Sequence, residues 1–328
     1  MSDFFVLASL VVTYARLAVF SRASSDEHDP LHPLVSAEPS RASRTIVPHP
    51  RVYAAKRASV IAAGITGVHF VVDFDRTLTT NEVTAGERGA TCHGIVETRR
   101  GAEFLARARA LNDYYYPREV DSSLSHAERT KFMIEWYAAI NAMIASSGLT
   151  RSMLRDDCSA ARLRIRRGMA DLVRAASAGA MVTIFSAGIG DVIDEVLRQR
   201  WGGVSENLRV VSNWMRWECG TCVDFSPPLI HVFNKSAAAL GDGPHATSAR
   251  ARRAVVLCGD SEGDPAMADG LDADTVLRIG FLNSRNPTRE AIETYSKLYD
   301  VVLVGDAPAW TLEDIIRELL GTAPQQVV

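Results

Sequence analysis

Four short stretches of the sequence end in side chains that could do chemistry. Each stretch contains a strand-like apolar run, and the candidate residues are Asp73, Asp75 and Thr77 after HFVV, Ser186 and the backbone of Ala187 after MVTIF, Lys235 at the end of LIHVFNK, and Asp260 and Asp264 in GDSEGD. Singly, each stretch has an ordinary structural alternative, such as a turn, a helix N-cap or a solvated lysine. Together, and in this order, they favour one shared site.

The residue types indicate which chemistry this site would support. If Asp73, Asp75 and Asp260 meet at one edge of the fold, their charges repel unless a cation lies between them. Oxygen ligands without His or Cys favour a hard cation, and magnesium fits best. Lys235, Ser186 and backbone N–H groups at helix starts suit an anion. A cation, anion-binding donors and a spare carboxylate describe phosphoryl chemistry.

The elements around these residues predict how they are brought together. Continuous apolar runs alternate with helical patterns, for example at residues 68–74, 208–215, 254–259 and 276–282. This alternation predicts an α/β fold with a parallel sheet covered on both faces, in which ligands bind beyond the carboxyl ends of the strands.

A long interval with helical patterns separates Asp75 from Ser186, at about residues 97–112, 125–146 and 150–163. Within it, Trp136 and Tyr137 lie at helical spacing with apolar neighbours and are interpreted as core. The basic run ARLRIRR, residues 161–167, is interpreted as a solvated helix face.

The order DxDxT, Ser, Lys and GDxxxD resembles the haloacid dehalogenase superfamily of phosphohydrolases. Longer runs, among them TCHGIVE, FSAGIGDVIDEVLRQ, LIHVFNK and LCGDSEGDPAMADG, resemble the cytosolic pyrimidine 5′-nucleotidases of type III over about residues 50–320. The resemblance implies a Rossmann-like core with an inserted helical cap. It also implies magnesium-dependent hydrolysis of nucleoside 5′-monophosphates, with CMP and UMP favoured. Some relatives also accept 7-methylguanosine monophosphate.

The resemblance further implies a role for each residue of the site. Asp73 would attack phosphorus and form an aspartyl-phosphate, and Asp75 would protonate the leaving 5′-oxygen and then activate water. Magnesium would be held by Asp73, by the backbone carbonyl of Asp75 and by Asp260. Ser186, the Ala187 N–H and Lys235 would bind phosphoryl oxygens, and Asp264 and Thr77 would hold the residues of the site in place from behind. Glu119 would contact the nucleoside, and His93 and Tyr114 to Tyr116 are weaker candidates for contact with the base.

The domain boundaries expected from this interpretation divide the chain into three parts. Residues 1–46 form an apolar segment and linker, residues 47–84 and 166–328 the catalytic core, and residues 85–165 the cap. The apolar segment at residues 4–20 is interrupted by Arg16 and is shorter than the ~20 residues of a typical membrane span. A weak anchor, a targeting segment and a helix lying on the domain remain open for it.

Net charge and cysteine content limit the binding partners and the cellular compartment that can be expected. The net charge of −3 and the 47% hydrophobic content are those of a globular protein and argue against binding a nucleic-acid polymer. Five scattered cysteines favour reduced thiols and a cytoplasmic location, and the single CxxC of Cys219 and Cys222 is interpreted as two loop cysteines rather than a zinc site. Two other functions stay open: nucleoside phosphotransfer, and a scaffold with a vestigial site.

Overall fold

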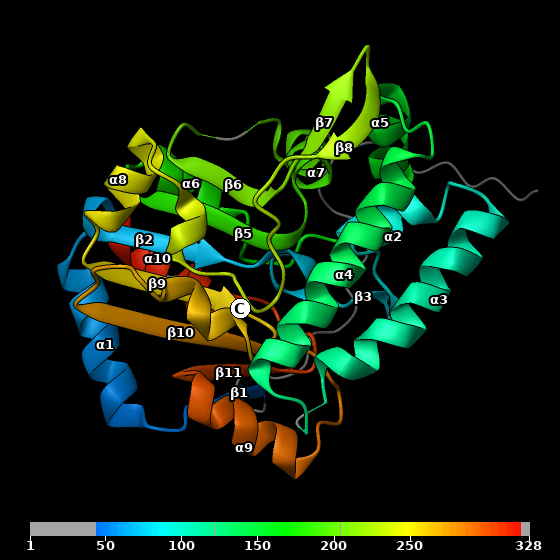
Figure 1. Cartoon of the computed structure of the whole chain (residues 1–328). Helices are drawn as coiled ribbons and strands as arrows, with labels where there is room; N and C mark the ends of the chain where they lie inside the picture. The colour runs from blue at the N-terminus through cyan, green and yellow to red at the C-terminus, as the bar shows by residue number, and fades with distance from the viewer. Residues whose placement is uncertain (1–43, 122, 204, 323–328) are drawn as a thin grey trace, which may run out of the picture. The chain divides into compact units, whose positions relative to one another are not determined.

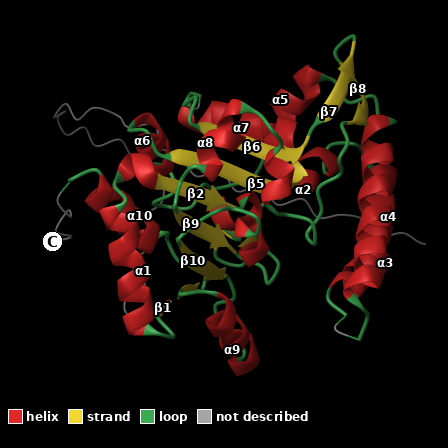
Figure 2. Ribbon diagram, turned by 60° about the vertical axis from the view of Figure 1, so that its left-hand side comes forward, coloured by secondary structure: helices red, strands yellow, loops and turns green. Residues whose placement is uncertain are grey.

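The computed structural model describes residues 44–121, 123–203 and 205–322 and shows a seven-stranded sheet (Figures 1 and 2). The strand order is β1-β11-β10-β9-β2-β5-β6, and all neighbours are parallel except β1 against β11. The bounds are β1 Thr45–Ile46, β2 Val68–Val72, β5 Met181–Ile189, β6 Leu208–Asn213, β9 Ala254–Gly259, β10 Thr275–Leu282 and β11 Val301–Val304. The predicted parallel α/β sheet is confirmed.

Alternating side chains of the central strands feed two apolar layers, one on each face of the sheet. In β2, Phe70 and Val72 pack into one layer and Val71 into the other, so the strand is buried throughout. Helices of the first layer are α1 (Pro50–Ala62), α6 (Asp171–Ser177), α7 (Gly190–Trp201) and α10 (Trp310–Leu319); those of the second are α8 (Pro244–Arg250) and α9 (Arg289–Leu298).

A helical insertion separates β2 from β5. It contains the hairpin β3 (Glu82–Thr84) and β4 (Glu87–Arg88), and the helices α2 (Cys92–Glu97), α3 (Ala102–Glu119), α4 (His126–Ala145) and α5 (Arg151–Ala160). Helices α3 and α4 pack side by side beyond the carboxyl ends of the strands (Figures 1 and 2). A capping box of Ser125 and Glu128 starts α4, in which each side chain accepts a hydrogen bond from the backbone N–H of the other residue.

The hairpin β7 (Met215–Glu218) and β8 (Thr221–Phe225) reaches the insertion from the core side. The N–H of Cys222 donates to the Leu149 carbonyl at 2.8 Å, and the N–H of Arg151 donates to the Gly220 carbonyl at 3.1 Å. The guanidinium of Arg151 also lies 4.4 Å from the centre of the Trp217 ring. This hairpin therefore holds the junction of α4 and α5.

Two sequence interpretations were wrong in their local structure. LIHVFNK is a loop and not a strand, because side-chain amides replace a strand neighbour. The Asn213 side chain bonds both the N–H and the carbonyl of Ile230 at 2.8 Å, and the side-chain Oδ1 of Asn234 accepts from the His231 N–H at 2.7 Å. Lys235 therefore reaches the sheet edge from a loop.

The basic run at residues 161–167 is extended rather than helical. The Thr80 N–H donates to the Arg164 carbonyl at 2.9 Å, and the Arg166 N–H donates to the Leu78 carbonyl at 2.8 Å. The run thus pairs with the chain that leaves β2, and within it Arg166 is buried, at 1% exposed, while Arg164 is exposed.

The first strand begins before the expected boundary at residue 47, since Thr45 and Ile46 pair with β11. The expectations for residues 1–43, including the apolar segment, lie outside the described residues. Among the residues that are described, no helix has the length and apolar character needed to cross a membrane.

A buried polar chain lies between the sheet and α8. The imidazole Nε2 of His69 and the Thr183 hydroxyl are 2.8 Å apart, and the same hydroxyl is 3.2 Å from the Nε2 of His245. Burial, with a smaller contribution from nearby positive charge, lowers the pKa of His69 to about 3 and that of His245 to about 4. Both rings are therefore neutral in the folded protein at neutral pH.

Acid should destabilise the fold through these histidines. The unfolded chain takes up a proton at each near pH 6.5, but the folded chain does so only near pH 3 to 4, so their contribution is complete above pH 6.5 and is lost as the pH falls. For the fully buried His69 this costs up to about 1.4 kcal/mol per pH unit inside that window.

Urea unfolding of wild type and His69→Gln at pH 7.5, 6.0 and 5.0 measures this effect. Gln keeps a partner for Thr183 but does not titrate, so the variant should lose less stability than wild type between pH 6.5 and 5. His49→Gln, at an exposed ring, should follow wild type. Parallel curves for wild type and His69→Gln would contradict the assignment.

Candidate active site

Asp73 lies at the carboxyl edge of the sheet because β2 and β9 continue their pairing one step further. Its N–H donates to the Cys258 carbonyl at 3.0 Å, after which the chain turns away through residues Phe74–Leu78. Asp260 follows directly after β9. Gly259 lets Asp264 pack close, since a Cβ at this glycine would lie 2.3 Å from the Cβ of Asp264.

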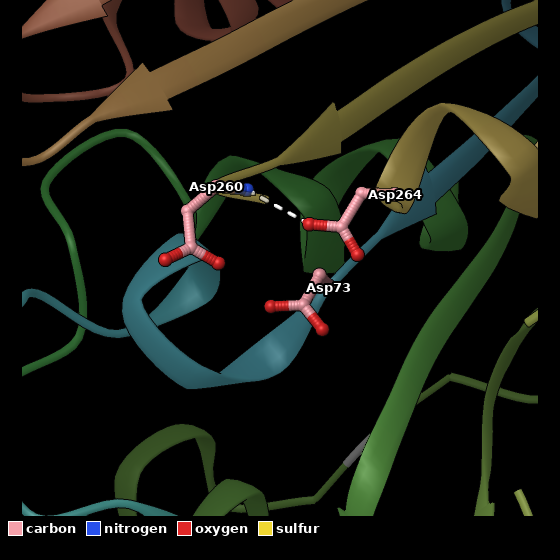
Figure 3. Close-up of side chains that lie close together, drawn as sticks. All are labelled: Asp73, Asp260 and Asp264. Atoms are coloured by element: carbon pink, nitrogen blue, oxygen red, sulfur yellow. Dashed lines mark hydrogen bonds between the residues drawn. The ribbon is translucent and has the colours of Figure 1, made fainter. Parts of the chain in front are cut away.

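Lys235 connects two of the carboxylates. Its Nζ lies 2.6 Å from Asp73 Oδ1 and 2.8 Å from Asp264 Oδ1, and all three side chains are buried. The other oxygen of Asp264 accepts the N–H groups of Asp260 at 3.0 Å and Ser261 at 2.9 Å, the former drawn in Figure 3. Both carboxylate oxygens of Asp264 thus have hydrogen-bond partners, and Asp264 fixes the positions of Lys235 and the loop after β9.

Asp73 and Asp260 face each other across a small space, with Asp264 beside them (Figure 3). One carboxylate oxygen from each of the three lies within 4.8 Å of the others. Burial raises the pKa of Asp73 to about 7 against the opposing charge of Lys235, and burial followed by repulsion from Asp73 raises the pKa of Asp260 strongly. Such a donor set fits a hard divalent cation, whose charge would keep both carboxylates ionised.

Lys235 remains charged in this environment. Burial alone would lower its pKa, but the adjacent Asp264 and Asp73 together raise it. The amine therefore balances only part of the negative charge, and the remaining charge of Asp73 and Asp260 is available to a cation.

Asp75 is turned away from this cluster. Its carboxylate accepts the N–H of Cys92, at the start of α2, at 3.0 Å. Burial raises the pKa of Asp75, whereas this hydrogen bond lowers it. A carboxyl group with a raised pKa at this edge suits the exchange of a proton.

The other predicted core residues lie around the same edge. Ser186 is buried in β5, the neighbour of β2, and its Oγ accepts the Gly188 N–H at 3.0 Å. It is not the cap of α7, which starts at Gly190. The Thr77 hydroxyl donates to Asp260 Oδ1 at 3.4 Å. The structure therefore brings the four sequence stretches to one sheet edge.

Glu119 ends α3 and faces the core. Burial raises its pKa and the charge of Arg76, in the turn after Asp75, lowers it. Tyr137 packs against the second apolar layer, and the charges of Glu119, Lys235 and Asp75 act on its hydroxyl. The Tyr137 ring lies 5.9 Å from that of His93. The interpretation of Tyr137 as core is therefore correct for its packing, but helical spacing alone did not show that its hydroxyl lies near the charges of the site.

Sequence reasoning missed two further residues near the carboxylates. Asn283 Nδ2 lies 3.4 Å from Asp260 Oδ2 and 2.9 Å from the Arg76 carbonyl. Arg166 donates to the carbonyls of Thr77 and Arg76 from inside the protein. An apolar strand ending in Asn, IGFLN, was a usable signal for Asn283; for Arg166 the basic run pointed to solvent.

The fold and the site together define a phosphohydrolase of the haloacid dehalogenase class, with a parallel sheet, carboxylates at its edge and an inserted helical region. A sequence model of the pyrimidine 5′-nucleotidase (UMPH-1) family matches residues 76–320, so the chain belongs to this family of hydrolases.

Individual relatives agree with this assignment. The chain is 32% identical over 255 residues to 7-methylguanosine phosphate-specific 5′-nucleotidase A of Xenopus laevis, covering 76% of this chain and 87% of the relative. It is 29% identical to the Homo sapiens 7-methylguanosine phosphate-specific 5′-nucleotidase, covering 76% and 84%. The crystal structure of cytosolic 5′-nucleotidase IIIB bound to cytidine matches with a TM-score of 0.75 at 27% identity, covering 85% of this chain and 95% of that one.

Removing the amine should expose the cost of the buried carboxylates. We expect Lys235→Met to lower the free energy of unfolding by about 3–5 kcal/mol in protein treated with a chelator, because Asp73 and Asp264 lose their partner. Lys297→Met, at an exposed lysine of α9, serves as the control. Chemical denaturation measures both variants, and equal stability of the two would contradict the role of Lys235.

Proposed function

We propose that this protein is a 5′-nucleotidase that hydrolyses nucleoside 5′-monophosphates to nucleoside and phosphate. The observation that carries the proposal is the buried group of Asp73, Lys235 and Asp260 at the carboxyl edge of the sheet. Membership of the pyrimidine 5′-nucleotidase family supports it. We also propose a cytoplasmic location, on the name of the solved relative.

The side chains can be assigned to the steps of hydrolysis. Asp73 Oδ2 is not engaged by Lys235 and attacks phosphorus, forming an aspartyl-phosphate as the nucleoside 5′-oxygen leaves. Asp75, with its raised pKa, protonates that oxygen and then takes a proton from the water that cleaves the intermediate. Lys235 and the Ser186 hydroxyl hold phosphoryl oxygens, as does the Ala187 N–H.

We propose magnesium as the cofactor. Asp73 and Asp260 would hold it with their carboxylates and Asp75 with its backbone carbonyl. Asp264 is left out of this set because both of its carboxylate oxygens already have hydrogen-bond partners. When bound, the ion supplies charge that offsets the carboxylates and the phosphoryl oxygens. Asp264 and Thr77 hold Lys235 and Asp260 in place from behind.

The insertion is proposed to select the nucleoside. Glu119 and Tyr137 face the core from α3 and α4, and a buried carboxylate suits ribose hydroxyls or N–H groups of a base. We place the cap at residues 85–165 and the catalytic core on both sides of it, with β1 at Thr45–Ile46 included in the core. CMP and UMP are the favoured substrates; 7-methylguanosine monophosphate is the alternative that the relatives' names raise.

Phosphate release from CMP, UMP, 7-methyl-GMP and AMP with magnesium tests the function. We expect turnover of CMP and UMP, and a loss on the order of 10⁴-fold or more in kcat for Asp73→Asn, because the amide cannot attack phosphorus. Asp272→Asn, at a carboxylate that is 86% exposed, should match wild type.

The proposal fails if wild type releases no phosphate from any of these nucleotides, or if Asp73→Asn remains active. A nucleoside acceptor included in the assay reveals phosphotransfer, because a new nucleotide would then form in place of free phosphate.

Glu119 gives a separate prediction about the nucleoside. Glu119→Gln should lower kcat/KM for CMP by about 10- to 100-fold, the loss of one charge-assisted hydrogen bond of ~1.5–3 kcal/mol. Hydrolysis of p-nitrophenyl phosphate, which has no nucleoside, should stay unchanged. Glu103→Gln, at an exposed position of α3, is the matched control. An equal loss on both substrates would contradict nucleoside contact.

A further inference from the structure

The turn that carries Asp75 is held from inside the protein by one guanidinium. The Arg166 Nε donates to the Thr77 carbonyl at 2.7 Å, and its Nη2 donates to the carbonyls of Arg76 at 2.6 Å and Thr79 at 3.2 Å. Arg166 is 1% exposed and its guanidinium lies 4.3 Å from the centre of the Phe281 ring. Its N–H groups are therefore shielded from water, and three of the hydrogen bonds they donate go to carbonyls of the turn.

The other side of the same guanidinium binds Asp306 and Ala307, and Asp306 in turn contacts the segment that enters the insertion. The Arg166 Nη1 donates to the Ala307 carbonyl at 2.7 Å and lies 3.1 Å from Asp306 Oδ1. The Asp306 carboxylate accepts the N–H groups of Asn81 at 2.8 Å and Glu82 at 2.9 Å. One ion pair thus joins the turn after β2 to the segment that enters the helical insertion.

A second contact extends this arrangement to the carboxylate cluster. The Arg166 Nη2 donates to Asn283 Oδ1 at 3.0 Å, which fixes the orientation of that amide. The Asn283 Nδ2 is thereby directed at the Arg76 carbonyl at 2.9 Å and at Asp260 Oδ2 at 3.4 Å. Asp260 is therefore steadied by a side chain whose own direction depends on Arg166.

The turn needs this support because Arg76 is strained. Its φ is +64°, in the left-handed region that non-glycine residues seldom occupy because it is strained for them. Such a conformation persists only where the surroundings hold it, and the Arg76 carbonyl accepts from both Arg166 and Asn283. These donors fix the backbone between Asp75 and Thr77.

We propose that Arg166 is a positioning residue that fixes the turn bearing Asp75 and, through Asn283, the carboxylate of Asp260. This inference rests on the proposed function for its kinetic consequences, but its effect on metal binding can be measured without any substrate. Arg166 acts on the site through the backbone carbonyls of the turn and the Asn283 amide.

Arg166→Lys is the sharpest variant, because Lys keeps the charge but lacks the planar fork that reaches several carbonyls at once. We expect kcat for CMP to fall about 10- to 100-fold while KM changes less than about threefold. Arg164→Lys, the same change at an exposed position two residues away, should match wild type. An unchanged kcat in folded Arg166→Lys would overturn the proposal.

Asn283→Ala removes the contact with Asp260 and one bond to the Arg76 carbonyl, and it spares the bonds from Arg166 to the turn. Titration with Mn²⁺ followed by electron paramagnetic resonance should show about tenfold weaker binding for this variant and for Arg166→Lys. Wild-type Mn²⁺ affinity in Asn283→Ala would overturn the link, even if Arg166→Lys failed to fold.

The double variant separates positioning from general loss of stability. If Arg166 acts on Asp260 through Asn283, the Mn²⁺ affinity of Arg166→Lys/Asn283→Ala should be close to that of the weaker single variant. Losses that multiply would show two independent effects and would overturn the proposed route. If wild type binds Mn²⁺ but hydrolyses no nucleotide, the proposed function fails while the metal titrations still decide the role of Arg166.

Discussion

The repulsion between carboxylates at the end of β2 and β9 is the constraint on which the rest of the structure depends. Burying Asp73 and Asp260 next to each other is unfavourable unless positive charge is close, and Lys235 at 2.6 Å from Asp73 supplies one part of it. Because Lys235 is shared with Asp264, it cannot neutralise the whole cluster. The charge left over is what makes the site suited to a cation and, with that cation, to a phosphate group.

The parallel sheet explains how residues far apart in the chain reach this one place. β2 lies between β5 and β9, so Asp73, Ser186 and Asp260 leave neighbouring strands at the same edge. Lys235 arrives differently, on a loop whose backbone is held by the side chains of Asn213 and Asn234. These amide side chains form the hydrogen bonds with the loop backbone that a neighbouring strand forms elsewhere in the sheet.

Much of the fold and of the site could be predicted from sequence, because apolar runs ending in polar residues carry a strong local signal. The parallel α/β sheet follows from such runs, and so does the shared edge of Asp73, Ser186 and Asp260. LIHVFNK shows the limit, since an apolar run can lie in a loop when side chains elsewhere satisfy its backbone. Tyr137 and Arg166 show another limit, because their surroundings come from segments distant in the chain.

Arg166 has a further meaning for how the insertion and the core relate. The chain enters the insertion beside Asp306 and returns from it at Arg166, and these two residues form an ion pair at 3.1 Å. Both ends of the insertion are thus fixed at the turn that carries Asp75, and not at a distant point of the core. Because Glu119 lies in the insertion and Asp75 in the turn, this shared anchor sets the distance between the groups proposed to bind the nucleoside and to transfer its proton.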